Sequence, residues 1–184
     1  TNFYPVWGSC PSSQETNGIY LDANGITIKC DDCQPGSKGV LNGIEYTVVD
    51  RDMLIQMISN GNDVSKVVTT PINSMANLFL ENESFNQDIS SWDTSNVISM
   101  NRIFKGATSF NQNISSWNVA KVEDMNEMFR SAESFNQPIG AWDVSGVSNM
   151  SAMFLDADSF NQPIGSWDVS NVTNMSYMFS DTPF

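Results

Sequence analysis

The sequence predicts an α/β solenoid, a stack of 25-residue strand–helix coils with a parallel sheet, preceded by an N-terminal cap that contains β-hairpins. Three observations lead to this fold class. Methionine, phenylalanine and tryptophan recur with a step of 25 residues, two apolar periods alternate inside each unit, and the first 46 residues lack the repeat. Self-similarity at a fixed period of this length is typical of stacked repeat proteins.

The repeat is strict enough to define its units. The columns with a 25-residue step are Met75, Met100, Met125, Met150 and Met175; Phe79, Phe104, Phe129, Phe154 and Phe179; and Trp92, Trp117, Trp142 and Trp167. The predicted solenoid, 47–184, has full units at 72–96, 97–121, 122–146 and 147–171, a partial unit at 172–184 and a degenerate first unit at 47–71. We expect these columns to form the core, since burying each such side chain contributes roughly 1.5–3 kcal/mol.

Two apolar periods alternate inside each unit. The first has the spacing of one helical stripe, as in Val97, Met100, Ile103 and Phe104. The second has the spacing of a short strand in a leucine-rich repeat, as in Ile114, Trp117, Val119 and Val122. One strand and one helical segment per coil therefore give the predicted parallel sheet.

These residues resemble the BspA-type leucine-rich-repeat surface proteins. The segments that carry the resemblance are 159–170 (SFNQPIGSWDVS) and 171–179 (NVTNMSYMF), and the match covers 72–184 and, more weakly, 47–71. The resemblance implies a bacterial or protist protein at the cell surface or secreted, used for adhesion and protein–protein contact. It carries over no catalytic residues.

The predicted N-terminal cap covers residues 1–46. Apolar pairs flank Asp22-Ala23-Asn24-Gly25 and Asn42-Gly43, and both segments predict hairpin turns. Asp50 is the expected N-cap of a helix that runs through Ile58 and is closed by Asn60-Gly61.

The three cysteines all lie in this cap. A disulfide from Cys10 to either Cys30 or Cys33 is the favoured interpretation, and the sequence does not choose between the two partners. A redox site at Cys30-Asp31-Asp32-Cys33 is disfavoured because the acidic neighbours raise a thiol pKa. A zinc site is disfavoured because one further Cys and no His remain to complete it.

Charge and composition exclude several classes of partner. The chain has 8 basic and 21 acidic residues, a net charge of −13, so it repels nucleic acid and anionic lipid. Since no apolar run approaches the roughly 20 residues of a membrane span, we expect no direct membrane insertion. The chain begins at Thr1 and ends in mid-unit, so we expect a processed extracellular or cell-surface protein whose solenoid continues or is covered.

Side chains that flank the buried strand residues are the expected ligand-binding residues on the concave face. They are Ser91, Asp93, Ser95, Asn118, Asp143, Ser145, Asp168 and Ser170. Three interpretations remain open: a carboxylate ladder that holds Ca²⁺, capping of the following helical segment, and recognition of a partner. Apart from that Ca²⁺, we expect no cofactor and no metal site.

These patterns predict a cell-surface or secreted module for adhesion or for binding a protein or glycan on a surface or matrix. The alternative is a structural spacer or assembly component of a larger surface complex. We expect no enzyme activity, because the paired carboxylates recur once per coil whereas a catalytic pair breaks the symmetry of a repeat.

Overall fold

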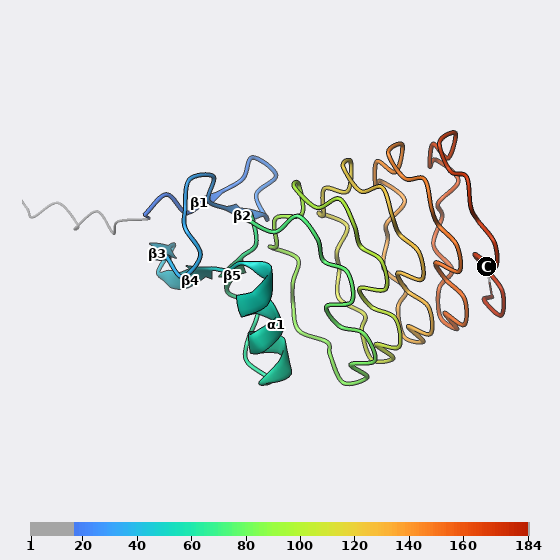
Figure 1. Ribbon diagram of the computed structural model, residues 1–184, viewed down its shortest axis with the longest axis horizontal. Coiled ribbons are helices and arrows are strands. Elements are labelled where there is room, and N and C mark those ends of the chain that lie inside the picture. Colours follow the sequence, from blue (N-terminus) through green and yellow to red (C-terminus); the bar gives the residue numbers. More distant parts are fainter. Residues whose placement is uncertain (1–16, 184) are drawn as a thin grey trace, which may run out of the picture.

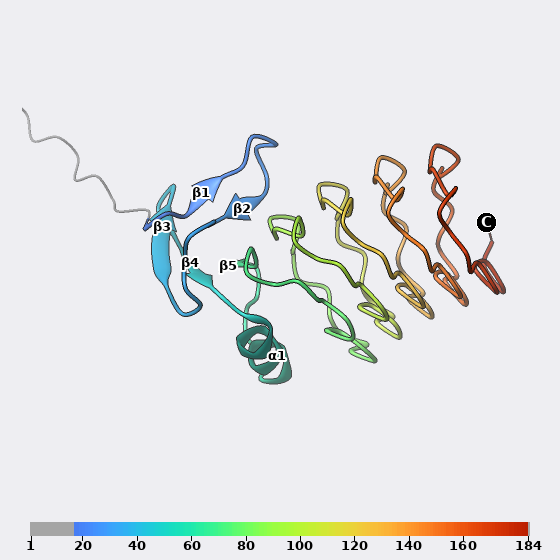
Figure 2. The same cartoon turned by 45° about the horizontal axis from the view of Figure 1, so that its top comes forward.

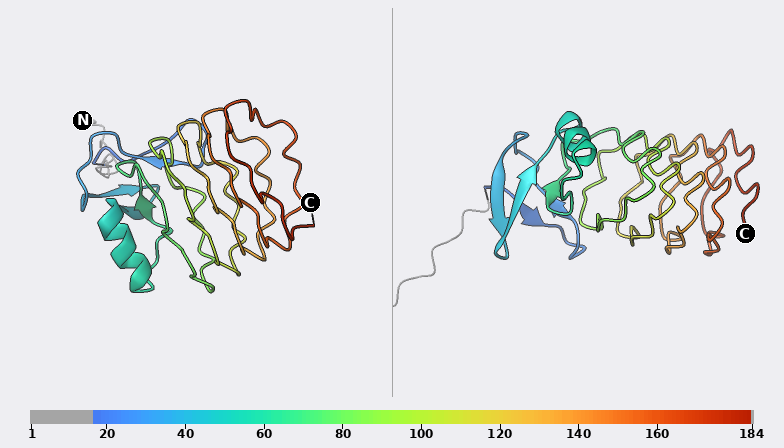
Figure 3. Two further views of the ribbon diagram at one scale, coloured as in Figure 1. Left: turned by 45° about the vertical axis from the view of Figure 1, so that its right-hand side comes forward. Right: turned by 90° about the horizontal axis from the view of Figure 1, so that it is seen from below.

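The described part of the chain is a row of stacked coils with two small sheets and one helix at its N-terminal end (Figures 1 and 2). A computed structural model describes residues 17–183. Its elements are β1 (Tyr20–Leu21), β2 (Ile28–Lys29), β3 (Lys38–Leu41), β4 (Ile44–Val48), α1 (Arg51–Ser59) and β5 (Val67–Val68). The coils that follow β5 lie side by side along the long axis, as Figure 3 shows from two further directions.

Both predicted hairpins are confirmed. β1 pairs antiparallel with β2, and β3 pairs antiparallel with β4 across the two-residue turn Asn42-Gly43. The turn residues have φ values of 52° and 80°, the left-handed pair that a tight hairpin requires. β5 then pairs in parallel with β4, so the cap and the first unit share one sheet. The boundary predicted between residues 46 and 47 therefore falls inside β4.

The helix predicted after Asp50 is also confirmed. The Asp50 side chain accepts a hydrogen bond from the Met53 N–H at 2.8 Å and so satisfies one of the free amides of the first turn. Asn60 is the C-cap, and Gly61 follows it with a φ of 68°. α1 connects β4 to β5 and lies at the N-terminal end of the stack (Figure 1).

The predicted fold class is wrong for the coils themselves. Among the described residues α1 is the sole helix, and the two sheets, one antiparallel and one mixed, belong to the N-terminal part and β5. No strand–helix repeat is formed between residues 72 and 183; each coil consists of turns and irregular segments. The α/β leucine-rich-repeat solenoid is therefore replaced by a stack of turn-built coils.

Hydrogen bonds between coils explain why the helical stripe is not a helix. The amides of Met100, Arg102, Phe104 and Gly106 donate to carbonyls 24 residues ahead, on the next coil, at 2.8–3.0 Å. An α-helix would direct the same amides to the fourth residue back. Arg102 and Gly106 also have φ values of 53° and 71°, which interrupt a right-handed helix twice in five residues.

The predicted strand is absent for a related reason. Parallel pairing between coils is limited to single-residue bridges, which join Ser74, Ser99, Asp124, Asn149 and Asn174. The segment around Trp117 instead bends, with its amide bonded to the Ile114 carbonyl three residues back at 3.1 Å. Its indole N–H donates to the Ile89 carbonyl of the preceding coil at 3.1 Å. The apolar residues are buried as predicted, but turns position them.

The Met, Phe and Trp columns form the core as the sequence predicts, except on the last coil, where Met175 is 39% exposed and Phe179 is partly buried. Successive phenylalanines from Phe79 to Phe179 stack with ring centroids 5.5–5.7 Å apart. A second column runs from Phe85 to Phe160 with centroids 5.9–6.1 Å apart. Because every coil places its rings on those of its neighbours, the rings form continuous rows that tie the stack together.

Candidate functional site

The structure divides the predicted binding residues into a covered and an exposed set. Asp93 is 2% exposed and lies under the β1–β2 hairpin, where the Ile28 amide donates to the Ser91 carbonyl at 2.8 Å. Lys29 Nζ lies 3.9 Å from Asp93 Oδ1, and Ser95 is half-buried beside it. Ser91, Asp93 and Ser95 are therefore part of the junction between the hairpin and the coils.

The remaining residues form a row on the later coils, which we call the turn row: Asn118, Asp143, Ser145, Asp168 and Ser170. All are exposed except Ser145, which is half-buried. Each acidic or amide side chain closes its own turn. Asp143 Oδ1 accepts the amide and the hydroxyl of Ser145 at 3.1 and 2.6 Å, and Asp168 Oδ1 accepts the Ser170 amide at 3.0 Å. Asn118 does the same for the Ala120 amide at 3.1 Å.

This geometry corrects the expected concave sheet face, because the strands that would have formed that face are absent. It also differs from capping of a following helix, since no helix follows in these coils. The side chains act instead as local turn closers of the kind that Asp and Asn form with the residue two positions on.

The turn geometry also sets the charge of the row. Hydrogen bonds from the Ser145 hydroxyl and amide hold the pKa of Asp143 below its usual value, against a smaller opposing effect of the Asp168 charge. The Ser170 hydrogen bonds lower the pKa of Asp168 in the same way. Both carboxylates are therefore ionised at neutral pH, and their second oxygens remain available to accept hydrogen bonds from a partner.

Residues 17–183 contain no group of three or more His, Cys, Asp or Glu side chains placed to hold a metal ion. No helix in the same part of the chain has the length and apolar character needed to cross a membrane.

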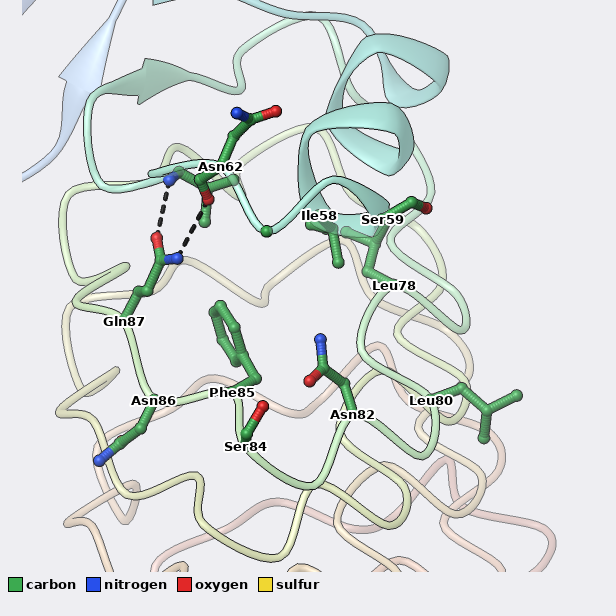
Figure 4. A pocket seen from close by; sticks show the side chains of 12 residues that line it. Ile58, Ser59, Asn62, Leu78, Leu80, Asn82, Ser84, Phe85, Asn86 and Gln87 are labelled. Atoms are coloured by element: carbon green, nitrogen blue, oxygen red, sulfur yellow. Dashed lines mark hydrogen bonds between the residues drawn. The ribbon is translucent and has the colours of Figure 1, made fainter.

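A second candidate site lies between α1 and the first full coil (Figure 4). It is a pocket of ≈ 570 Å³ whose lining includes Ser59, Leu80, Asn82, Ser84 and Phe85. Sequence reasoning missed this pocket. Its signal is a break in the repeat: Ser59-Asn60-Gly61-Asn62 stands where each of the four full units has Ser-Phe-Asn-Gln, so the first phenylalanine of that column is Phe85.

The disulfide in the structure joins Cys30 to Cys33. Cys10, the expected partner of one of them, lies outside the described residues. Cys30 is 1% exposed and packs with Ile28, Val48 and Val68 in a small core beneath the two sheets. The cross-link therefore closes a short loop in the cap.

One group of charged residues crosses two coils. Glu127 is 12% exposed, and its carboxylate lies 2.5 Å from Lys105 Nζ, 3.3 Å from Arg102 and 3.5 Å from Arg130. Burial acts to raise the pKa of Glu127, but the hydrogen bonds from Lys105 and Arg102 outweigh it and the pKa is lowered. This cluster is an ion network that joins two coils.

Residues 51–154 and 117–184 match a protein family described as "Mycoplasma protein of unknown function, DUF285". The chain belongs to this family. The matched segments begin at α1 and cover all the coils, and they leave out the two hairpins of the cap. Searches of curated proteins and of solved structures gave no match. DUF285 membership therefore names the repeat and assigns no activity to it.

Proposed function

We propose that this DUF285 chain is a non-catalytic binding module of the cell surface or extracellular space, which recognises a protein or glycan partner through the turn row. The observation that carries the proposal is the repetition of one exposed chemistry on adjacent coils. Asp143 and Asp168 present the same ionised carboxylate on the same turn, one coil apart, with Ser145 and Ser170 beside them.

Such a row suits a repetitive or extended partner. Its free carboxylate oxygens accept hydrogen bonds from sugar hydroxyls, backbone amides or basic side chains, and bonds that involve a charged group are the stronger ones. The phenylalanine columns beneath fix the spacing of the coils, so the row is preorganised and little conformational entropy is lost on binding.

Two further observations support the proposed location. A disulfide in the cap favours an oxidising compartment, since cytosolic proteins keep their thiols reduced. The likeness of 159–179 to BspA-type surface proteins points the same way. The runner-up is a spacer within a larger surface complex, in which the same stack would hold other parts at a distance and the turn row would bind nothing.

The direct test uses the double variant Asp143→Asn with Asp168→Asn. Asn118 closes its turn through the same atom, so asparagine keeps the turn and removes the charge. We expect beads coated with the chain to adhere to immobilised matrix proteins or glycans, and the double variant to lose at least about tenfold in binding, the effect of 1.4 kcal/mol.

A matched control is Asp63→Asn with Asp88→Asn. These residues close equivalent turns elsewhere on the stack, and the change in net charge is the same. We expect this variant to bind like the unmodified chain. Equal binding by all three proteins would exclude the turn row, and binding by none would favour the spacer.

A further inference from the structure

The pocket between α1 and the first coil lies where one segment of the repeat, Ser-Phe-Asn-Gln, is missing from the preceding unit. In later coils the Ser-Phe-Asn-Gln segment of each unit rests on the same segment of the preceding unit. In the unit 47–71 the end of α1 and the turn at Gly61 replace that segment, so the first coil has no such neighbour on this side. The pocket is the space that results (Figure 4).

The coils show which contacts this layer normally makes. The Ser109 amide donates to the Glu83 carbonyl at 3.1 Å, and the Asn111 amide donates to Asn86 Oδ1 at 3.0 Å. The ring of Phe110 lies on that of Phe85, with centroids 5.9 Å apart. The next two coils repeat all three contacts at the corresponding positions.

The first coil presents the same groups without the partners. Within residues 17–183 the amides of Ser84 and Asn86, which correspond to those of Ser109 and Asn111, have no hydrogen-bond acceptor. Phe85 lines the pocket, and the Asn82 and Ser84 side chains point into it (Figure 4). The lining therefore includes two exposed residues with free amide donors, Ser84 and Asn86, and between them Phe85, which is 6% exposed and stacks on Phe79 with ring centroids 3.7 Å apart.

The walls of the pocket are held in place by Gln87. Its Nε2 donates to the Asn62 carbonyl at 3.1 Å, and its Oε1 accepts the Val64 amide at 2.7 Å (Figure 4). In later coils the equivalent glutamine bonds to the Asn of the preceding coil instead, as Gln112 does to Asn86. This change of partner ties the loop after α1 to the coil and leaves the amides of Ser84 and Asn86 uncovered.

We propose that this pocket binds an extended peptide segment that contains an aromatic residue followed by asparagine. A carbonyl two residues before the aromatic residue accepts the Ser84 amide, the asparagine Oδ1 accepts the Asn86 amide, and the aromatic ring packs against the part of Phe85 that remains exposed in the pocket. Such a peptide restores the missing layer in the way that a strand added to a sheet edge satisfies free backbone groups. The site is separate from the turn row and does not depend on its function.

The test is a titration of the isotopically labelled chain with the blocked pentapeptide Glu-Ser-Phe-Asn-Gln, the sequence of residues 83–87, followed by amide NMR shifts. We expect saturable shifts at the Ser84 and Asn86 amides. Peptides with Phe→Ala or Asn→Ala should each bind about tenfold more weakly, since an aromatic contact or a hydrogen bond is lost.

Protein variants locate the site independently. Ser59→Trp places a large ring in the pocket and should abolish the shifts, whereas Gln56→Trp, on the same helix but outside the pocket lining, should leave them unchanged. The Asp143→Asn/Asp168→Asn variant should bind the peptide normally, so failure of the turn row and failure of the pocket are distinguishable. Shifts scattered over the surface, or equal affinity for all three peptides, would overturn the proposal.

Discussion

Units 47–71 and 97–121 occupy the same register but fold differently. The first places its apolar residues on α1, with Leu54 buried and Asp50 and Asn60 as caps. The second places Phe104, the residue that corresponds to Leu54 in the repeat, on a row of turns with two left-handed residues, Arg102 and Gly106. The spacing of apolar residues therefore selects the buried face, whereas the available hydrogen-bond partner selects the backbone conformation.

Arg51 marks the point where the two conformations meet. In the coils a main-chain amide donates to the carbonyl of the next coil, as the Asn77 amide does to the Asn101 carbonyl at 2.9 Å. The equivalent amide, that of Asp52, lies in the first turn of α1 and does not donate to the Ala76 carbonyl. The Arg51 guanidinium donates to this carbonyl instead, at 2.7 Å. The helix therefore ends the ladder of inter-coil hydrogen bonds without leaving this acceptor unsatisfied.

The largest expected effect tests whether the coils depend on their aromatic columns. Trp142 is 4% exposed and its indole N–H bonds to the Ile114 carbonyl at 3.2 Å. Trp142→Ala should lower the free energy of unfolding by roughly 3–5 kcal/mol in denaturant titrations. The control Tyr177→Ala, at a side chain 72% exposed, should change it by about 0.5 kcal/mol or less. A loss under about 1 kcal/mol for Trp142→Ala would contradict its place in the core.

The next effect tests how closely the coils approach one another. A Cβ at Gly140 would clash with the backbone carbonyl of Pro163 on the next coil, whereas one at Gly165, the equivalent position, would meet open space. We expect Gly140→Ala to destabilise the chain by about 1–3 kcal/mol and Gly165→Ala to be neutral or slightly stabilising. Equal melting temperatures for the two variants would show that the coils separate easily.

A smaller loss of stability is expected at the contact between α1 and the first coil. Arg51→Met removes the donor to the Ala76 carbonyl and should cost about 1–2 kcal/mol, as loss of a charge-assisted hydrogen bond does. Lys66→Met removes the same charge from an exposed pair with Asp63, at 3.6 Å, and should cost about 0.5 kcal/mol or less. If the two variants unfold at the same denaturant concentration, the role assigned to Arg51 is wrong.

The smallest effect concerns pH. Because the pKa of Glu127 is lowered in the folded chain, its ion network stabilises the fold above the unfolded value of 4.5 and is lost as pH falls through the folded pKa. Acidification below about 4.5 should therefore destabilise the unmodified chain more than the Glu127→Gln variant. Parallel stability–pH curves for the two proteins would show that the Glu127 ion network does not stabilise the fold.

Much of the architecture was predictable because it depends on local or strictly periodic signals. The Asn42-Gly43 turn, the Asp50 N-cap and the buried Phe and Trp columns each follow from residue type and spacing. The backbone of the coils was not predictable in this way. Arg102 and Glu127 adopt φ values of 53° and 52°, which sequence does not suggest for side chains of this size, and inter-coil hydrogen bonds hold them there.

The candidate sites were also predictable only in part. The periodicity identified Asp143 and Asp168 as exposed, but it gave Asp93 the same role, because the β1–β2 hairpin that covers Asp93 lies outside the repeat. The pocket at Phe85 arises from a departure from the repeat, so the regular pattern concealed it. In both cases an N-terminal element outside the regular repeat alters the surface of a coil: the β1–β2 hairpin covers Asp93, and α1 forms one wall of the pocket at Phe85.

NMR scalar coupling across the hydrogen bonds of residues 97–107 distinguishes coils built from turns from coils that contain a helix. We expect couplings from the amide nitrogens of Met100, Arg102 and Phe104 to the carbonyl carbons of Asp124, Asn126 and Met128 on the next coil. Couplings from these amides to the carbonyl four residues back would instead show a helix, and would contradict the turn-built stack.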